Sequence, residues 1–141
     1  MTKESREQVS LLQKVPLFSS LNTKQLRTIA AGGKELSFTP GQHIVDEGAV
    51  GVGFFLVLVG QVRVREGRKT LAELKAGDFF GEMSLFDAQP RSATVEAVTE
   101  TKCLGISAWA FIGMIKSNPD IAINLMKEMA ARLRLSNKGL A

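Results

Sequence analysis

Two short motifs place a lone carboxylate and a lone guanidinium nine positions apart, at Glu82 and Arg91. The first motif runs Phe80-Gly81-Glu82-Met83-Ser84-Leu85-Phe86, and the second runs Pro90-Arg91-Ser92-Ala93-Thr94-Val95. Each charged residue stands beside small or backbone-exposing residues. This arrangement suits a small ligand with one hydroxyl-bearing end and one anionic end, such as a sugar phosphate.

Glu82 is the residue expected to hold the hydroxyl-bearing end. An ionised carboxylate can accept a hydrogen bond from a sugar hydroxyl, and its charge makes that bond stronger than a neutral pairing. Gly81 lets the backbone approach the sugar closely because it has no side chain. If residues 82–86 form a single helical turn, its free amide groups favour an anion nearby.

Arg91 is the residue expected to hold the anion. Its guanidinium presents a planar fork of donors that can bind two oxygens at once, which a lysine cannot copy. Ser92 and Ala93 are small, so their amides can reach the same anion, and the Ser92 hydroxyl adds a contact. Pro90 fixes the chain that enters Arg91 and lowers the entropy lost when a ligand orders the segment. The spacing alone fits a pair of surface charges or a salt bridge equally well.

The totals favour a single globular domain that brings the two motifs together. Residues 1–141 are enough to bury a core as one domain. The net charge of +4 comes from basic residues spread along the chain, which gives little support for nucleic-acid binding. The single cysteine, Cys103, cannot form an internal disulfide, which fits a reducing compartment. Because the N-terminus is polar and no apolar run is long enough to cross a bilayer, we expect a soluble, cytoplasmic protein.

Residues 1–33 are expected to form N-terminal helices. The segment 3–14 has a short amphipathic pattern, and Asn22 stands three residues before Gln25, which is the spacing of a capping box. The helix that Asn22 begins is expected to end at Gly32-Gly33 in a left-handed C-cap.

The pattern changes to short strands with frequent turn signals over residues 34–107, which include the motif-bearing segment 80–95. Val62-Arg63-Val64-Arg65 alternates between apolar and charged residues, as a strand with one wet face does. Many short strands at regular spacing are typical of a sandwich or barrel, and a jelly roll is the natural closed form. Further strands are expected at 36–38, 43–45, 54–59, 71–74, 94–98 and 102–106.

Helical periodicity returns over residues 108–141. Residues 108–116 are expected to form one helix, and Asn118-Pro119 provides an N-cap and first position for a final helix. In that helix an apolar residue recurs every four positions, at Ile121, Leu125, Met129 and Leu133. The stripe fits packing on the barrel of its own chain or on a second copy.

The two motifs closely resemble the phosphate-binding cassette of cyclic nucleotide-binding domains, and they match it at nearly every defining position. The similarity extends over residues 15–137, and the last helix is similar to the long helix of bacterial catabolite-activator-type (Crp/Fnr) regulators. The resemblance implies a mainly β fold, in which a jelly-roll β-barrel is flanked by N-terminal helices and two C-terminal helices. It also implies a regulatory module of signal transduction that binds a cyclic nucleotide.

The resemblance assigns a role to individual residues. Glu82 and the Gly81 backbone would hold the ribose, and Arg91, Ser92 and Ala93 would hold the phosphate. The positions that match pocket residues near the sugar and base are Val64, Leu71, Ala72 and Met83. At the end of the last helix, Ser136 and Asn137 match the polar residues that reach the base.

The ligand that the resemblance implies is cAMP or cGMP. A hydroxyl directly after the cassette arginine can favour guanine, and Ser92 has one, yet bacterial cAMP regulators also have serine there. We therefore expect cAMP rather than cGMP. Binding is expected to order the cassette and to draw the final helix over the base.

The chain departs from those regulators at its C-terminus, because they continue into a DNA-binding domain and this sequence stops at Ala141. We therefore expect no direct DNA binding and no membrane contact by this chain. It would be either a stand-alone sensor or the sensor part of a longer protein with a separate output domain or partner. A homodimer through the final helix is expected from the same relatives.

Two alternatives stay open, in which the barrel serves as a dimerisation module or senses another effector, such as haem or a small acid. A metal-dependent barrel enzyme is not expected, because a single histidine, His43, and a single cysteine cannot form a metal-binding cluster. His43 is interpreted as structural and Cys103 as a small core residue. The sequence thus predicts no catalytic residue and no bound metal.

Overall fold

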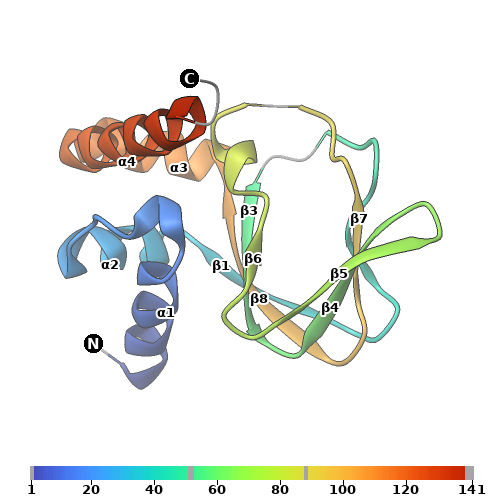
Figure 1. Ribbon diagram of the computed structural model, residues 1–141. Coiled ribbons are helices and arrows are strands. Elements are labelled where there is room, and N and C mark those ends of the chain that lie inside the picture. The colour runs from blue at the N-terminus through green and yellow to red at the C-terminus, as the bar shows by residue number, and fades with distance from the viewer. Residues whose placement is uncertain (1, 51–52, 88, 139–141) are drawn as a thin grey trace.

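The computed structural model describes residues 2–50, 53–87 and 89–138, and it places helices on one side of a β-barrel (Figure 1). Before the barrel come α1 (Lys3–Gln13), the short 3₁₀ helix η1 (Pro16–Phe18) and α2 (Thr23–Ala31). After the barrel come α3 (Ala108–Ser117) and α4 (Pro119–Lys138).

Two antiparallel four-stranded sheets make the barrel. The first sheet has the order β1 (Lys34–Phe38), β8 (Thr101–Ser107), β3 (Gly53–Val59) and β6 (Phe79–Phe80). The second has the order β2 (His43–Val45), β7 (Thr94–Ala97), β4 (Gln61–Glu66) and β5 (Lys69–Lys75). The expectation of a mainly β, jelly-roll fold with flanking helices is confirmed.

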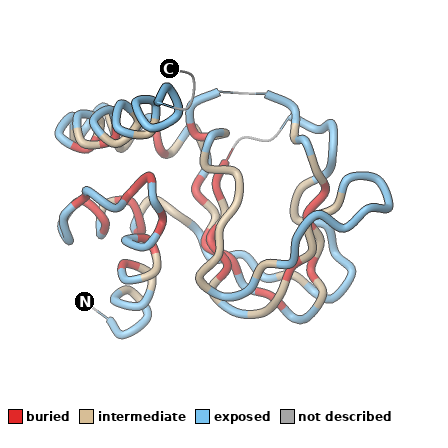
Figure 2. The backbone as a smooth tube through the Cα atoms, in the orientation of Figure 1, coloured by how far each residue is buried: buried red, intermediate tan, exposed pale blue. Residues whose placement is uncertain are grey.

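Strand β3 divides its side chains between two hydrophobic cores. Phe54 and Leu56 join the larger core, which the helices form against the first sheet. Phe55 and Val57 point the other way and pack inside the barrel with residues of the second sheet. This follows from the alternation of side chains along a strand. The buried residues accordingly gather along the first sheet and the inner sides of the helices (Figure 2).

The N-terminal helices begin as the sequence predicts, but α2 ends differently. Asn22 Oδ1 accepts from the Gln25 amide at 2.9 Å and the Gln25 side chain accepts from the Asn22 amide at 2.9 Å, so the predicted capping box is confirmed. The left-handed C-cap was a wrong prediction, because Gly32 has a φ of −82°. A Cβ at Gly32 would lie only 2.6 Å from Met114 Sδ, so any larger residue here would displace the flexible Met114 side chain of α3.

The two-residue strand β6 is an element that the sequence pattern did not reveal. Its Phe79 lies 6.0 Å from Phe54 and its Phe80 stacks on Phe55 at 5.1 Å between ring centroids. Adjacent residues of β6 therefore anchor in the two different cores. This fixes the direction in which the chain leaves β6 at Gly81.

Helix α4 packs on its own domain through only part of the predicted apolar stripe. Ile121 and Leu125 are buried and Met129 packs against the core, whereas Leu133 is 62% exposed. The interpretation that the stripe packs on its own barrel thus holds for the first half of the helix.

The two residues interpreted as structural occupy different surroundings. Cys103 is fully buried inside the barrel, and this burial raises the pKa of its thiol to about 11. His43 begins β2 on the surface of the second sheet, with Nδ1 2.6 Å from Asp46 Oδ1. None of the helices in the described ranges combines the length and apolarity needed to cross a bilayer.

Candidate functional site

Gly81 turns the chain out of β6 into the short 3₁₀ helix η2 (Glu82–Leu85). Its φ of +81° lies in the left-handed region, which favours glycine. A Cβ at this position would lie 2.6 Å from the Gly53 carbonyl oxygen and would collide with Arg91 Nη1. The missing side chain at Gly81 therefore makes room for the guanidinium.

A pocket of about 490 Å³ lies between η2 and the segment that leads into β7. Its polar lining includes Glu82 from one side and Arg91 and Ser92 from the other. Apolar residues from four strands complete the wall, namely Val45, Val64, Phe80 and Val95. The two charged residues that stand nine positions apart in the sequence thus face one cavity.

The Arg91 guanidinium is hydrogen-bonded through Nη2, whereas its Nε has no partner in the described ranges. Nη2 donates to the Gly53 carbonyl at 2.7 Å, while the buried Nε has no partner among the residues that the structure describes. Partial burial lowers the pKa of Arg91 from its usual value, because desolvation disfavours the charged form. An anion in the pocket would offset that cost and accept the free N–H.

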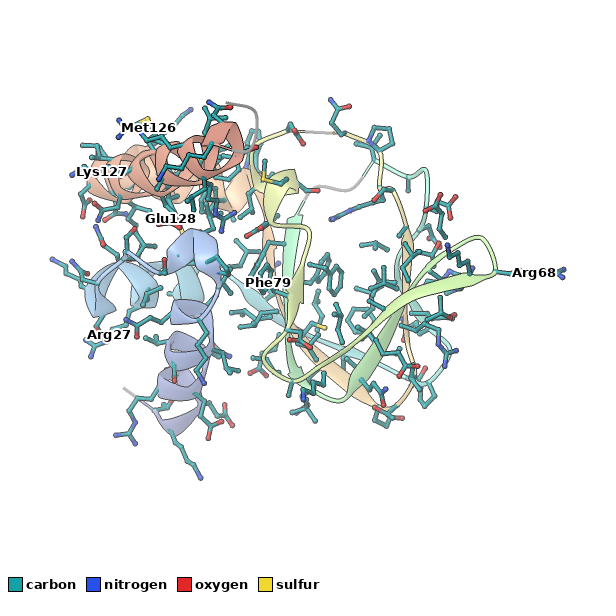
Figure 3. The ribbon with its side chains drawn as sticks, viewed as in Figure 1. Arg27, Arg68, Phe79, Met126, Lys127 and Glu128 are labelled. Atoms are coloured by element: carbon teal, nitrogen blue, oxygen red, sulfur yellow. The ribbon has the colours of Figure 1, made fainter. Side chains whose placement is uncertain are left out.

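Glu82 is linked to the last helix by an ion pair. Arg132 Nη1 of α4 lies 3.4 Å from Glu82 Oε1, and Arg132 Nε lies 3.8 Å from Glu128 Oε1 one turn earlier. Glu128 lies on the lower side of α4, the side facing the rest of the domain (Figure 3). Glu82 Oε2 and Arg132 Nη2 are both buried, and neither has a hydrogen-bond partner within the described parts of the chain. Two residues that line the pocket, Glu82 and Arg91, thus each carry a buried polar atom without a partner in the described ranges.

The family model of the cyclic nucleotide-binding domain matches residues 35–118, which include Glu82 and Arg91 of the pocket and most of the barrel. The chain belongs to the cyclic nucleotide-binding domain family. This confirms the resemblance that the cassette carries in the sequence.

Known relatives of this cyclic nucleotide-binding domain include a channel and a receptor protein. A cyclic nucleotide-gated potassium channel of Rhizobium etli is 37% identical over 86% of this chain, which spans 34% of the channel. A cyclic AMP receptor protein of Thermus thermophilus is 33% identical over 84% of this chain, which spans 57% of that receptor. The chain thus spans about a third to somewhat over half of these relatives.

A solved structure shows the same fold. The N-terminal domain of a transcriptional regulator from Streptomyces coelicolor superposes with a TM-score of 0.86 at 30% identity, over 93% of this chain and 95% of that one. The predicted similarity to the sensor domains of bacterial transcriptional regulators is therefore confirmed.

The structure gathers most of the predicted site residues of this cyclic nucleotide-binding domain around one pocket. Those that line it are Gly81, Glu82, Met83, Arg91, Ser92, Ala93 and Val64. Four others lie outside its lining. Ala72 pairs with Val64 across β4 and β5, and Leu71 is exposed beside it. Ser136 and Asn137 are exposed near the end of α4.

Sequence reasoning missed Arg132 and most of the apolar wall. Arg132 stands among other charged residues of α4, and nothing in its spacing shows that it meets Glu82 across the domain. The apolar wall residues Val45, Phe80 and Val95 lie on strands, where alternation could have pointed to the barrel interior. In the described ranges, no group of three or more His, Cys, Asp or Glu side chains is arranged to hold a metal ion.

We predict that Gly81→Ala disrupts the site beyond the backbone strain that it adds. The matched control is Gly41→Ala, because Gly41 has a similar φ of +86° and open space where its Cβ would stand. The left-handed strain should cost each variant about 1–2 kcal/mol of unfolding free energy. Chemical denaturation should show a larger loss for Gly81→Ala, since the guanidinium must also move. Equal losses in the two variants would contradict the close packing of Gly81 and Arg91.

Proposed function

We propose that this domain is a regulatory sensor without enzymatic activity, and that it binds cAMP in preference to cGMP. The observation that carries the proposal is that Glu82 and Arg91 line one pocket and that each has a buried polar atom, Oε2 and Nε respectively, without a hydrogen-bond partner among the described residues. One is an acceptor and the other a donor. A ligand with a hydroxyl group and an anionic oxygen satisfies both, whereas a purely apolar ligand satisfies neither.

A cyclic nucleotide has both groups on one rigid ring system. We propose that Glu82 accepts a hydrogen bond from the ribose 2′-hydroxyl and that Arg91 binds the cyclic phosphate. Ser92 and Ala93 would bind the same phosphate through their amides. Val64, Met83, Leu71 and Ala72 would border the sugar and base, and Ser136 and Asn137 would approach the base from α4. Glu82 Oε2 and Arg91 Nε lack a hydrogen-bond partner among the described residues, which argues against a pocket that has lost its ligand and serves only for assembly.

The preference for cAMP is supported by the relatives and by the cassette. The Thermus thermophilus relative, 33% identical, is named a cyclic AMP receptor protein. Ser92 follows Arg91 directly, as in the cassettes of bacterial cAMP regulators. A serine at this position is therefore compatible with adenine.

Arg132 gives the final helix a means of sensing the ligand. It contacts Glu82, the residue that we assign to the ribose, from the helix that carries an exposed apolar face. A ribose hydroxyl on Glu82 would enter this ion pair and shift the balance between Glu82 and Glu128 as partners of Arg132. We propose that this couples pocket occupancy to the position of α4, and that an output domain or partner protein responds to it.

The exposed face of α4 supports a homodimer. Its residues follow a three–four spacing typical of a coiled-coil seam, namely Ile123, Met126, Ala130, Leu133 and Asn137. Ile123 is 50% exposed and Met126 59% exposed, and Met126 points away from α1 and α2 (Figure 3). A polar asparagine within such a seam specifies register between two like helices. We therefore propose that the exposed face of α4 packs against the same face of a second copy of this chain.

The first test is thermal unfolding with cAMP, cGMP and 5′-AMP, each at three concentrations. Ligand at about 100 times its dissociation constant adds about 2.7 kcal/mol of stability, and each kcal/mol raises Tm by roughly 2–8 °C at this chain length. We expect a concentration-dependent rise with cAMP, a smaller one with cGMP and none with 5′-AMP. A flat response from folded, ligand-stripped protein would contradict the proposal.

Titration calorimetry of variants assigns that binding to the pocket. Arg91→Ala should cost about 2–5 kcal/mol of binding free energy if the phosphate pair is desolvated. Arg91→Lys should also weaken binding because the guanidinium fork is lost. Arg68→Lys is the control, since Arg68 extends from the tip of the β4–β5 hairpin away from the barrel (Figure 3). An unchanged dissociation constant for both Arg91 variants would remove this residue from the site.

Amide hydrogen exchange tests the response of the final helix. In the wild type, cAMP should raise protection over residues 126–138. Arg132→Ala should abolish most of this rise, because the contact from α4 to Glu82 is lost. Arg134→Ala, on the exposed surface of the same helix, should retain it. Identical protection with and without ligand in the wild type would rule out the coupling.

Sedimentation velocity tests the proposed dimer. Met126→Glu should shift the wild-type dimer toward monomer, because it places a charge in the apolar seam. Ala131→Glu adds the same charge at an exposed position beside the seam and should leave the dimer intact. A wild-type protein that is monomeric at high micromolar concentration would contradict the assignment of this face.

A further inference from the structure

The backbone of Arg91 is held by a segment that comes much earlier in the chain, residues 46–49. The Gly48 amide donates to the Arg91 carbonyl at 2.8 Å, and the Arg91 amide donates to the Ala49 carbonyl at 2.8 Å. Both backbone groups of Arg91 are therefore paired with this one segment. Its position sets where the Arg91 side chain begins.

Glu47 fixes this segment at two points. Its amide donates to Thr94 Oγ1 at 2.9 Å, where the cassette enters β7, and its Oε1 accepts from the Gly67 amide at 2.9 Å. Gly67 lies in the turn between β4 and β5. A single residue thus joins the segment that holds Arg91 to the β4–β5 hairpin.

The hairpin turn is itself held by side chains of the second sheet. Arg65 Nη1 donates to the Gly67 carbonyl at 2.7 Å, and Arg65 Nε donates to Glu96 Oε1 on β7 at 3.1 Å. Gly67 therefore has its amide bound by Glu47 and its carbonyl bound by Arg65. Neither charged residue lines the pocket.

We propose that Glu47 is a positioning residue for nucleotide binding, acting through the Gly67 amide and Thr94 on the backbone of Arg91. The inference rests on the proposed function of the pocket. A bidentate contact to a phosphate needs the guanidinium placed to within a fraction of an ångström. The side chain of Arg91 is tied to Gly53 and its backbone to residues 48 and 49, so a displaced 46–49 segment moves the guanidinium.

The test compares Glu47→Ala with the conservative Glu47→Gln in cAMP titrations. Alanine removes the acceptor for the Gly67 amide, and we expect the dissociation constant to rise about tenfold. Glutamine keeps an oxygen at the same place and should restore affinity to within about threefold of the wild type. Wild-type affinity in the alanine variant would overturn the proposal. A glutamine variant as weak as alanine would also overturn it, because the charge and not the hydrogen bond would then matter.

A matched control separates positioning from general loss of surface charge. Glu73→Ala removes a carboxylate of the same sheet, and the hydrogen bonds of that carboxylate are with Gln61 and Arg63 rather than with residues 46–49. It should retain wild-type affinity. Thr94→Val and Thr94→Ser test the second anchor, since valine removes the acceptor for the Glu47 amide and serine retains it. We expect weaker binding for valine than for serine.

A measurement without ligand distinguishes failure of this inference from failure of the proposed function. In ligand-free protein, the exchange rate of the Arg91 amide proton should rise in Glu47→Ala and return toward wild type in Glu47→Gln. Glu73→Ala should leave it unchanged. Unchanged exchange in Glu47→Ala would overturn the positioning role, whether or not cAMP binds. If the Arg91 amide exchanges faster in Glu47→Ala but the wild type does not bind cAMP, the positioning role of Glu47 stands. The proposal that Arg91 binds a cyclic nucleotide would then be wrong.

Discussion

The partly buried guanidinium of Arg91, with no carboxylate paired to it in the described parts of the chain, is the constraint around which the pocket is built. Removing a cation from water is costly unless its protons are accepted. One carbonyl, that of Gly53, accepts from Nη2 and leaves Nε free. The missing side chain at Gly81 and the paired backbone of residues 48 and 49 make this arrangement sterically feasible. The domain thus holds a cation ready at a place where water is partly excluded.

The carboxylate of Glu82, across the pocket, differs from Arg91 because it has a charged partner within the domain. Glu82 already has a cationic partner in Arg132, so its charge is partly compensated before any ligand arrives. Arg91 has no such partner among the described residues. In the proposed complex, a phosphate would therefore add a new charge pair, whereas a ribose hydroxyl would join an existing one. The phosphate is accordingly expected to dominate affinity, and the ribose to connect occupancy to the last helix.

Local signals in the sequence predicted much of the fold, because their cause lies within a few residues. The capping box of Asn22 and Gln25 forms within one helical turn. The alternation along β4 arises because one face of the strand is solvent-exposed, so it can be read from the strand itself. The cassette was recognisable because its two motifs match those of the family at nearly every defining position, whereas the spacing of Glu82 and Arg91 alone fits a salt bridge equally well. Seven of the predicted pocket residues therefore lie around one cavity.

Features that depend on packing between distant segments escaped the sequence. The left-handed cap at Gly32 was a wrong prediction, because Gly32 has a φ of −82° and lies against Met114 of another helix. Strand β6 is defined by the aromatic contacts of Phe79 and Phe80 with β3 rather than by its own two residues. Arg132 meets Glu82 only because of the angle at which α4 crosses the domain. The contacts of Glu47 with Gly67 and Thr94 likewise join three separate strands and turns.

The buried thiol of Cys103 has a practical consequence for following these motions. A thiolate is the reactive form, and a fully buried thiol with a pKa of about 11 is almost entirely protonated at neutral pH. Since the sequence contains no other cysteine, a single cysteine introduced on the surface of α4 would react selectively with a fluorescent maleimide. The native protein is therefore ready for site-specific fluorescence labelling without prior removal of its own cysteine.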